Sequence, residues 1–199
     1  MTERIGAIVL AGGRSTRFGR DKLAEPIDGE PLLDHAIRAV KAVASDVVVV
    51  AAPGAATIVP DGVRLAHDPV AFEGPLAGLA AGLAALDPAI DRVVVVAGDM
   101  PSLAPTVLRR LIEAIGPAAD ASLLDVHGEP VPLPMAVRAE IAAESARRLL
   151  DGGERRLRAL PESLRTEVIA EAAWRLDDPH GASLRDIDRE ADLDVGRDA

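Results

Sequence analysis

The chain has 199 residues, a formal net charge of −10 and no cysteine, and aromatic residues make up only 2% of it. This length suits one domain whose core is built from Ala, Val, Leu and Ile. The lack of cysteine excludes disulfides and thiolate metal sites. The acidity argues against general nucleic-acid binding, and no apolar run reaches membrane-spanning length. We therefore expect a cytoplasmic protein without nucleic-acid or membrane partners, with 1–199 as a single domain and 194–199 as a disordered tail.

Strand and helix patterns alternate along the chain. Short apolar runs predict strands at 5–10, 46–51, 63–67, 92–97 and 119–126, and helical spacing of apolar residues predicts helices at 31–43, 76–86, 105–115 and 139–150. Residues 131–137 predict a strand at a sheet edge or a bend, because the run holds two prolines, and residues 167–174 fit either type. Repeated βα units predict an α/β fold of three layers (α/β/α), with a mostly parallel, Rossmann-like mixed sheet.

A glycine-rich stretch, LAGGRSTRFGRDK, follows the first predicted strand. Gly12 and Gly13 allow a sharp turn that exposes backbone N–H groups. The glycine spacing fits neither the dinucleotide fingerprint nor the P-loop. The residues leave two interpretations open, a basic surface turn and a cradle for a phosphate chain. In the second interpretation, the surrounding positive charge comes from Arg14, Arg17, Arg20 and Lys22.

The order of residues in this stretch resembles the signature of glycosyltransferase-A-like nucleotidyltransferases, and most of all that of the molybdenum cofactor guanylyltransferase family. Three later stretches resemble the same family in the same order, and an acidic close follows them. The resemblance covers about residues 5 to 193. Its motifs are Leu10-Ala11-Gly12-Gly13 with Ser15-x-Arg17-Phe18-Gly19-x-Asp21-Lys22, His67-Asp68 with Gly74-Pro75-Leu76-Ala77-Gly78, Gly98-Asp99-Met100-Pro101, Gly153-Glu154-Arg155-Arg156, and Asp186-Ile187-Asp188 with Leu193.

The resemblance implies a fold of the nucleotide-diphospho-sugar transferase type and transfer of GMP from GTP to the phosphate of Mo-molybdopterin. It implies Mg²⁺, or Mn²⁺ in its place, and allows transient contact with molybdoenzyme maturation proteins. Carried over residue by residue, it assigns catalytic roles to Arg17, Lys22 and Asp99 and metal binding to Asp99 and Asp188. Arg155 and Arg156 are weaker candidates for binding the acceptor. The resemblance assigns nucleotide binding to Leu10, Ala11, Gly12, Gly13, Lys22, Asp68, Gly74, Pro75, Leu76 and Asp99.

The chemistry of the aspartates supports these roles, and for each aspartate a purely structural role is the alternative. Asp99 follows the clearest predicted strand, so it is expected at the ligand edge of the sheet, where a carboxylate suits Mg²⁺. Its alternative is a turn-forming Asp. Asp188 is a second metal ligand, a helix N-cap, or both, and Asp186 is a weaker candidate ligand. Asp68 can accept from the ring N–H and the amino group of guanine, or it is an ordinary loop Asp before Pro69.

The other motifs also keep a structural alternative. The Gly74–Gly78 run begins a helix that a ligand approaches closely, or it reflects simple helix packing. Arg155 and Arg156 bind an anionic acceptor, or they begin a solvated helix. The four histidines show no ligand spacing and are interpreted as structural, and Trp174 as a packing residue.

Two departures from the family pattern leave undecided which nucleotide base the protein selects. Residues 47–52 contain no Asn, and Asp186-Ile187-Asp188 stands in place of Asn-x-Asn, a form also found in cytidylyl-transferring relatives. The enzyme alternative is therefore a cytidylyltransferase on the same cofactor or on another small phosphate. The alternative from another class is a degenerate nucleotide-binding accessory protein, against which the joint presence of Lys22, Asp99 and Asp188 argues.

Overall fold

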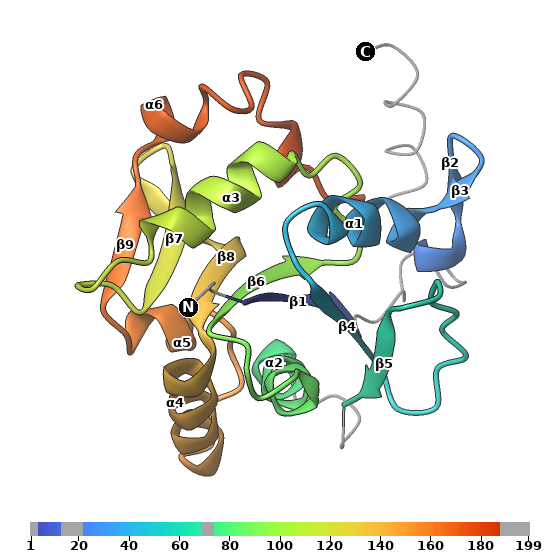
Figure 1. The fold of residues 1–199 in the computed structure, drawn as a ribbon, viewed down its shortest axis with the longest axis horizontal. Coiled ribbons are helices and arrows are strands. Elements are labelled where there is room, and N and C mark those ends of the chain that lie inside the picture. Colours follow the sequence, from blue (N-terminus) through green and yellow to red (C-terminus); the bar gives the residue numbers. More distant parts are fainter. Residues whose placement is uncertain (1–3, 13–21, 69–73, 188–199) are drawn as a thin grey trace.

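The apolar runs predicted as strands form one seven-stranded sheet in the computed structural model of the chain (Figure 1). The structure describes residues 4–12, 22–68 and 74–187. The strands lie side by side in the order β5-β4-β1-β6-β8-β7-β9. Their bounds are β1 (Ile5–Ala11), β4 (Asp46–Ala51), β5 (Arg64–His67), β6 (Arg92–Ala97), β7 (Ala121–Val126), β8 (Glu129–Arg138) and β9 (Thr166–Ile169).

Strand β1 lies inside the parallel part of the sheet. It pairs in parallel with β4 on one side and with β6 on the other, and β5 pairs in parallel with β4. The chain moves outward from β1 to β4 and β5 and then returns to β6, so the strand order switches between β1 and β6. A ligand is expected at such a switch, beyond the carboxyl ends of the strands.

Strand β8 differs from its prediction in one respect. It is not an edge strand, because it lies between β6 and β7 and is antiparallel to both. Its ladder with β6 ends at the pair Val95–Met135, so Pro132 and Pro134 lie beyond the part that β6 covers. The pairing with β7 is also irregular between Ser122 and Leu124. The prolines are thus accommodated where one neighbour is missing and the other ladder is distorted.

Helices cover both faces of the sheet and complete the predicted three layers (Figure 1). Successive residues of a buried strand point to opposite faces, so Ala7 and Val9 join one apolar cluster and Ile8 joins the other. The first cluster contains residues of α1 (Leu32–Lys41) and α3 (Pro105–Ala114) together with Trp174 of α6 (Glu171–Trp174). The second contains residues of α2 (Pro75–Ala85), α4 (Ala139–Asp151) and α5 (Ala159–Glu162).

The remaining elements are short. They are the two-stranded hairpin β2 (Pro26–Ile27) and β3 (Glu30–Pro31) and the 3-10 turns η1 (Lys22–Ala24) and η2 (Ala182–Leu184). None of the helices in the described ranges is long and apolar enough to span a membrane.

The predicted elements agree closely with the structure. The strands at 46–51 and 92–97 have the predicted bounds, and the other predicted helices and strands shift by a few residues at their ends. The ambiguous stretch 167–174 contains both types, since β9 ends at Ile169 and α6 begins at Glu171. Trp174 is fully buried, as its interpretation as a packing residue requires.

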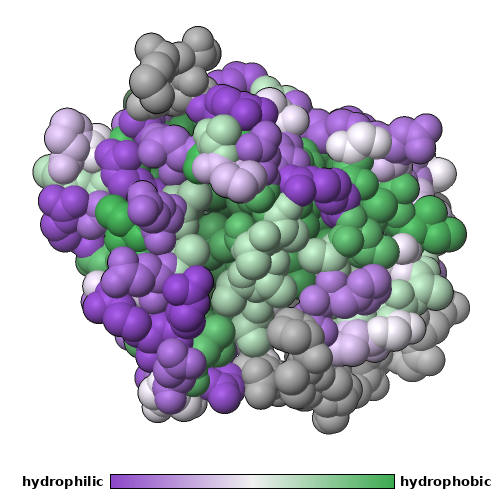
Figure 2. All heavy atoms as spheres, turned by 60° about the horizontal axis from the view of Figure 1, so that its bottom comes forward, coloured by the Kyte–Doolittle hydropathy of each residue, from purple (hydrophilic) through white to green (hydrophobic). Residues whose placement is uncertain are grey.

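Helix α2 contacts the sheet through its glycines. A Cβ atom built on Gly82 would lie 2.8 Å from a side-chain carbon of Ile8 and 3.0 Å from one of Val50. The helix is apolar all round: Ala84 is exposed, and Ala80, Ala81 and Ala85 are partly buried. Figure 2 turns this face toward the viewer and shows apolar residues gathered over the helix. The small residues let α2 lie directly on β1 and β4.

We expect Gly82→Val to lower the free energy of unfolding by about 2 kcal/mol, because the added methyl groups overpack the contact with Ile8 and Val50. Urea denaturation measures the change. Gly116→Val is the control, since a Cβ at Gly116 meets nothing within 4 Å. Equal stability of the two variants would contradict the close packing of α2 on the sheet.

Candidate functional site

A cavity of about 480 Å³ lies at the carboxyl ends of β1, β4 and β6, at the switch in strand order. Its walls are mostly apolar, with the ionisable side chains of Lys22, Asp68 and Asp99 among them. Apolar walls with a few polar groups are typical of a small-molecule site. The lining consists of Leu10, Ala11, Gly12, Lys22, Leu23, Val50, Ala51, Ala52, Pro53, Asp68, Gly74, Pro75, Gly78, Ala97, Asp99 and Leu133.

The first wall comes from the adjacent ends of β1 and β6. Leu10 is the register partner of Ala97, and the Gly98 N–H donates to the Leu10 carbonyl at 2.9 Å. The first predicted loop, from Gly12, and the second, with Asp99, therefore leave the sheet side by side. A Cβ on Gly98 would lie 3.1 Å from a methyl of Leu33, so this crossing point is tightly packed.

Asp99 and Lys22 form an ion pair in the cavity. Lys22 Nζ donates to Asp99 Oδ2 at 2.6 Å, and the two side chains are 15% and 20% exposed. Lys22 Nζ also donates to the Ile187 carbonyl at 3.1 Å, and the Ile187 N–H donates to the Asp99 carbonyl at 3.0 Å. Such partial burial makes the attraction stronger than between exposed charges. The structure thus brings together two of the predicted catalytic residues from positions 77 residues apart.

Asp68 lies at the opposite side of the cavity, directly after β5. Its N–H donates to the Ala51 carbonyl at 3.0 Å, which extends the pairing of β5 with β4 by one hydrogen bond. This contact places the residue at the end of β4, whose last residues also line the cavity. The position fits the predicted contact with a nucleotide base.

The corner at Gly74 and Pro75 depends on a second loop. Gly74 has φ +91° and ψ 169°, and a Cβ there would lie 2.7 Å from the Arg155 carbonyl oxygen. The Leu76 N–H donates to that same oxygen at 3.4 Å. Gly74, Pro75 and Gly78 line the cavity, so close approach of a ligand to these small residues stays a prediction. At Gly74 the backbone of Arg155 also lies close. Leu76 is fully buried in the core and is absent from the cavity lining.

The predicted acceptor residues take part in local structure. The Arg155 guanidinium donates to the carbonyls of Leu150 and Glu154, both at 2.9 Å. Arg156, whose side chain is 68% exposed, pairs with the Glu154 carboxylate at 2.6 Å. Hydrogen bonds from the Arg156 side chain and from the N–H groups of Arg156 and Arg155 lower the pKa of Glu154 to about 2. Neither arginine lines the cavity, although the Arg155 carbonyl supports its Gly74 corner.

Three predicted site residues, Gly13, Arg17 and Asp188, lie outside the described ranges, as do Arg14 and Arg20. Within those ranges, no three or more His, Asp or Glu side chains lie close enough together to form a metal site. Of the two predicted metal ligands, Asp99 lies in the described part of the chain, where it lines the cavity. A carboxylate oxygen at the ligand edge of the sheet suits Mg²⁺ or Mn²⁺.

Sequence reasoning missed part of the apolar lining of the cavity and one backbone contact. Val50, Ala51, Ala52 and Pro53 line the cavity at the end of β4. They could have been found, because ends of neighbouring parallel strands meet at one edge. Ile187 is the other omission: this buried apolar residue lies between the two aspartates of the closing motif and contacts both Asp99 and Lys22.

Comparisons with known proteins bear on the family and the fold of the chain. The sequence model of the MobA-like NTP transferase domain matches residues 7–168. A curated relative from Chloroflexus aggregans (strain MD-66 / DSM 9485), named probable molybdenum cofactor guanylyltransferase, is 33% identical over 195 residues, 95% of this chain and 91% of that protein.

Two solved structures share the fold. Molybdopterin-guanine dinucleotide biosynthesis protein A from Archaeoglobus fulgidus gives a TM-score of 0.76 at 23% identity, covering 96% of this chain and 95% of that chain. Rv0371c from Mycobacterium tuberculosis H37Rv, in complex with manganese, gives a TM-score of 0.66 at 24% identity, covering 84% of this chain and 88% of that chain. The predicted α/β fold of the nucleotidyltransferase type is thereby confirmed.

We expect Gly74→Ala to lower the free energy of unfolding by about 3 kcal/mol, because its backbone conformation is essentially restricted to glycine and the new methyl group meets the Arg155 carbonyl. Gly54→Ala is the matched control: Gly54 has φ +73°, but a Cβ there meets nothing within 4 Å. Its expected cost is about 1 kcal/mol. Chemical denaturation of both variants measures the difference, and equal costs would argue against the contact with Arg155.

An NMR titration of the Glu154 carboxyl carbon should give a midpoint of about 2, below its ordinary 4.5. Because the pKa of Glu154 is lower in the folded than in the unfolded state, its ionised carboxylate stabilises the folded protein at pH values above the unfolded-state pKa. This contribution is lost as the pH falls toward 2. Arg156→Ala should move the midpoint upward, while Arg158→Ala should leave it in place, because Arg158 pairs with Glu162 instead. A wild-type midpoint near 4.5 would contradict the loop geometry.

Proposed function

The chain belongs to the MobA-like NTP transferase family, and from this premise we propose that it is a molybdenum cofactor guanylyltransferase. It transfers GMP from GTP to the phosphate of Mo-molybdopterin and produces molybdopterin guanine dinucleotide and pyrophosphate. The observation that carries the proposal is the meeting of Lys22 and Asp99 in a cavity at the carboxyl ends of β1 and β6. One group is suited to the phosphates of a nucleotide and the other to a divalent cation.

The reaction needs no protein nucleophile. An oxygen of the acceptor's terminal phosphate, already an anion at neutral pH, forms a bond to the α-phosphorus of GTP. The bond from that phosphorus to the bridging oxygen breaks, and pyrophosphate leaves with the electron pair. The protein therefore acts by placing the two substrates and by stabilising the charge that develops on the leaving group.

The charged residues divide this work. We propose that Asp99, together with Asp188, holds Mg²⁺, and that Mn²⁺ can replace it. The cation supplies charge stabilisation at the phosphate oxygens. Lys22 turns from the Asp99 carboxylate toward the pyrophosphate end of the nucleotide, where Arg17 also acts. The N–H groups of Gly12 and Gly13 bind the β- and γ-phosphates.

Asp68 is the proposed base-reading residue. Its carboxylate can accept from both the ring N–H and the amino group of guanine. Its place at the end of β5, across the cavity from Asp99, supports a nucleotide that spans the sheet edge from base to phosphates. Arg155 and Arg156 stay weak candidates for the acceptor, because both side chains have hydrogen-bond partners within their own loop.

The choice of base can be tested by thermal unfolding of the protein with Mg²⁺ and each of GTP, CTP, ATP and UTP. A nucleotide at 100 times its Kd stabilises the folded state by about 2.7 kcal/mol and raises the melting temperature. We expect a shift with GTP. A shift with CTP alone would favour cytidylyl transfer, and binding without release of pyrophosphate would favour a degenerate accessory protein.

Asp99→Asn should reduce metal-dependent transfer about 100-fold or more while the fold is retained, because the neutral amide cannot replace the carboxylate toward a cation. Release of pyrophosphate measures the rate, and circular dichroism checks the fold. Asp61→Asn makes the same change on an exposed loop and should leave the rate unchanged. Full activity of the Asp99 variant would remove this residue from the mechanism.

Lys22→Ala should weaken GTP binding about tenfold or more, because a charge-assisted contact to the triphosphate is lost. Calorimetric titration with GTP in the presence of Mg²⁺ measures the affinity, with Lys41→Ala as a control, since Lys41 contacts the Asp61 carbonyl at the far end of α1. An unchanged affinity would count against the role of Lys22.

The single domain, the cytoplasmic location and the transient contact with maturation proteins stay predictions.

A further inference from the structure

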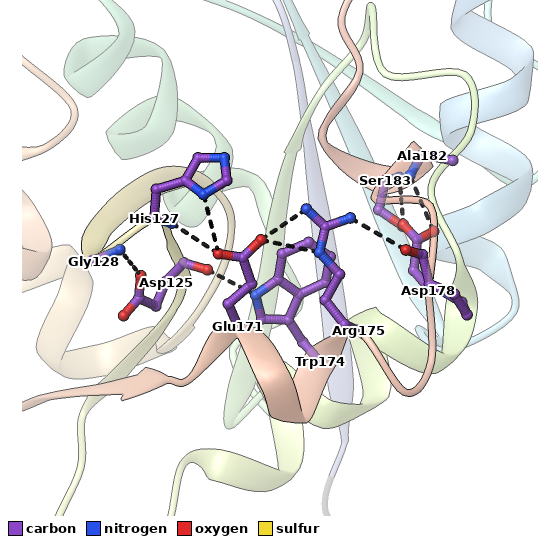
Figure 3. A network of polar contacts seen from close by, with 10 residues as sticks. Asp125, His127, Gly128, Glu171, Trp174, Arg175, Asp178, Ala182 and Ser183 are labelled. Atoms are coloured by element: carbon purple, nitrogen blue, oxygen red, sulfur yellow. Dashed lines mark hydrogen bonds and ion pairs between the residues drawn. The ribbon is translucent and has the colours of Figure 1, made fainter.

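The 175–187 segment runs alongside α3 from α6 to the loop between β6 and α3 (Figure 1). Hydrogen bonds within the segment and from it to that loop connect α6 with the cavity. The segment begins at a fixed point. Trp174 is fully buried and its indole N–H donates to the Asp125 carbonyl at 2.8 Å. Arg175 lies over the Trp174 ring, 4.6 Å from its centroid, and its guanidinium donates to Glu171 (Figure 3).

Asp178 folds the middle of the segment into a tight turn. Its carboxylate accepts from the N–H groups of Ala182 at 3.0 Å and Ser183 at 2.7 Å (Figure 3). Its carbonyl accepts from the Gly181 N–H at 3.1 Å. Only 6% of the residue is exposed. Burial raises the pKa of Asp178, but the hydrogen bonds from Ser183, Ala182 and Gly181 outweigh burial, so the pKa lies below its ordinary value. The carboxylate is therefore charged, and both of its oxygens accept hydrogen bonds within the turn.

The turn connects to the loop that carries Asp99 at both ends of that loop. The fully buried Ser183 accepts, at its Oγ, the N–H of Ala104 at 2.9 Å, immediately before α3. Four residues after Ser183, the Ile187 N–H donates to the Asp99 carbonyl at 3.0 Å. The Ile187 carbonyl then accepts from Lys22 Nζ at 3.1 Å. One segment thus fixes the Asp99 loop and also holds Lys22.

We propose that Asp178 is a positioning residue for nucleotidyl transfer: it folds the 175–187 segment so that Ser183 and Ile187 hold the Asp99 loop and Lys22 in place. Asp178 is absent from the cavity lining, so it acts through these residues and not on the substrates. The inference rests on the proposed function for its catalytic part. Its structural part, the dependence of the Asp99 loop on Asp178, is independent of any substrate.

Asp178→Asn is the test and Asp177→Asn its matched control. The first change replaces one carboxylate oxygen with an NH₂ group, which cannot accept a hydrogen bond. One of the two backbone N–H groups that donate to the carboxylate then loses its acceptor. The second removes the same charge one residue earlier, where the carboxylate pairs with Arg110 of α3 and not with the turn. Neither substitution changes the identity of a residue that lines the cavity.

Amide hydrogen exchange in residues 98–104 and at Ile187 should become about tenfold faster in Asp178→Asn than in Asp177→Asn. With saturating GTP and acceptor, kcat should fall about tenfold or more, because small displacements of catalytic groups are costly. The KM for GTP should change less than kcat, because the walls at Gly12 and Asp68 directly follow β1 and β5 and have no hydrogen bond to the segment among those described above.

Unchanged exchange in 98–104, or faster exchange with an unchanged kcat, would overturn the proposal. If Asp178→Asn does not fold, Ser183→Ala replaces it, because it removes the acceptor of the Ala104 N–H while keeping the charge of Asp178; it should move both readouts in the same direction. If the wild-type protein does not transfer GMP, the proposed function fails, and the exchange comparison alone determines whether Asp178 fixes the loop.

Discussion

The parallel pairing of β1 with both β4 and β6 is the constraint on which the site depends. Parallel strands direct their carboxyl ends to one edge of the sheet, so the loops that leave Ala11, Ala51 and Ala97 must open on the same side. The hydrogen bond from Gly98 to Leu10 continues this pairing beyond the last strand residue of β6. Any change of register would separate Asp99 from Gly12, which lines the same cavity.

The individual charged groups of the cavity, and not the net charge of the chain, suit this edge to a nucleotide with its cation. The chain as a whole carries a formal charge of −10, yet Lys22 lies in the cavity. Partly buried charges lose hydration, and the pairing of Lys22 with Asp99 offsets that loss. A nucleotide with its cation would provide each group with a new partner of the opposite sign, so neither charge would become isolated in the cavity.

Backbone groups from distant segments hold the loops of the site. The Arg155 carbonyl supports the Gly74 corner, and Ile187 contacts the Asp99 loop through its N–H and Lys22 through its carbonyl. Backbone contacts of this kind do not depend on the side chain of the residue that supplies the carbonyl or N–H group. They do depend on the conformation of the loop, which side chains such as Glu154 and Asp178 determine by accepting neighbouring N–H groups.

The sequence by itself determined the elements and the residues of most chemical interest. Apolar runs and helical spacing are local signals, so β4 and β6 have their predicted bounds, and Asp99 lies where a residue after a buried strand must lie. Trp174 as a packing residue also followed from its type.

Only the tertiary structure decided which distant groups meet. It placed β8 inside the sheet despite its prolines, because neighbouring ladders leave room for them, and it gave Gly74 the backbone of Arg155 as its neighbour. It also made Ile187 a contact of both Lys22 and Asp99. Such contacts join residues far apart in the chain, and no local pattern records them because a carbonyl or N–H group is present at almost every position.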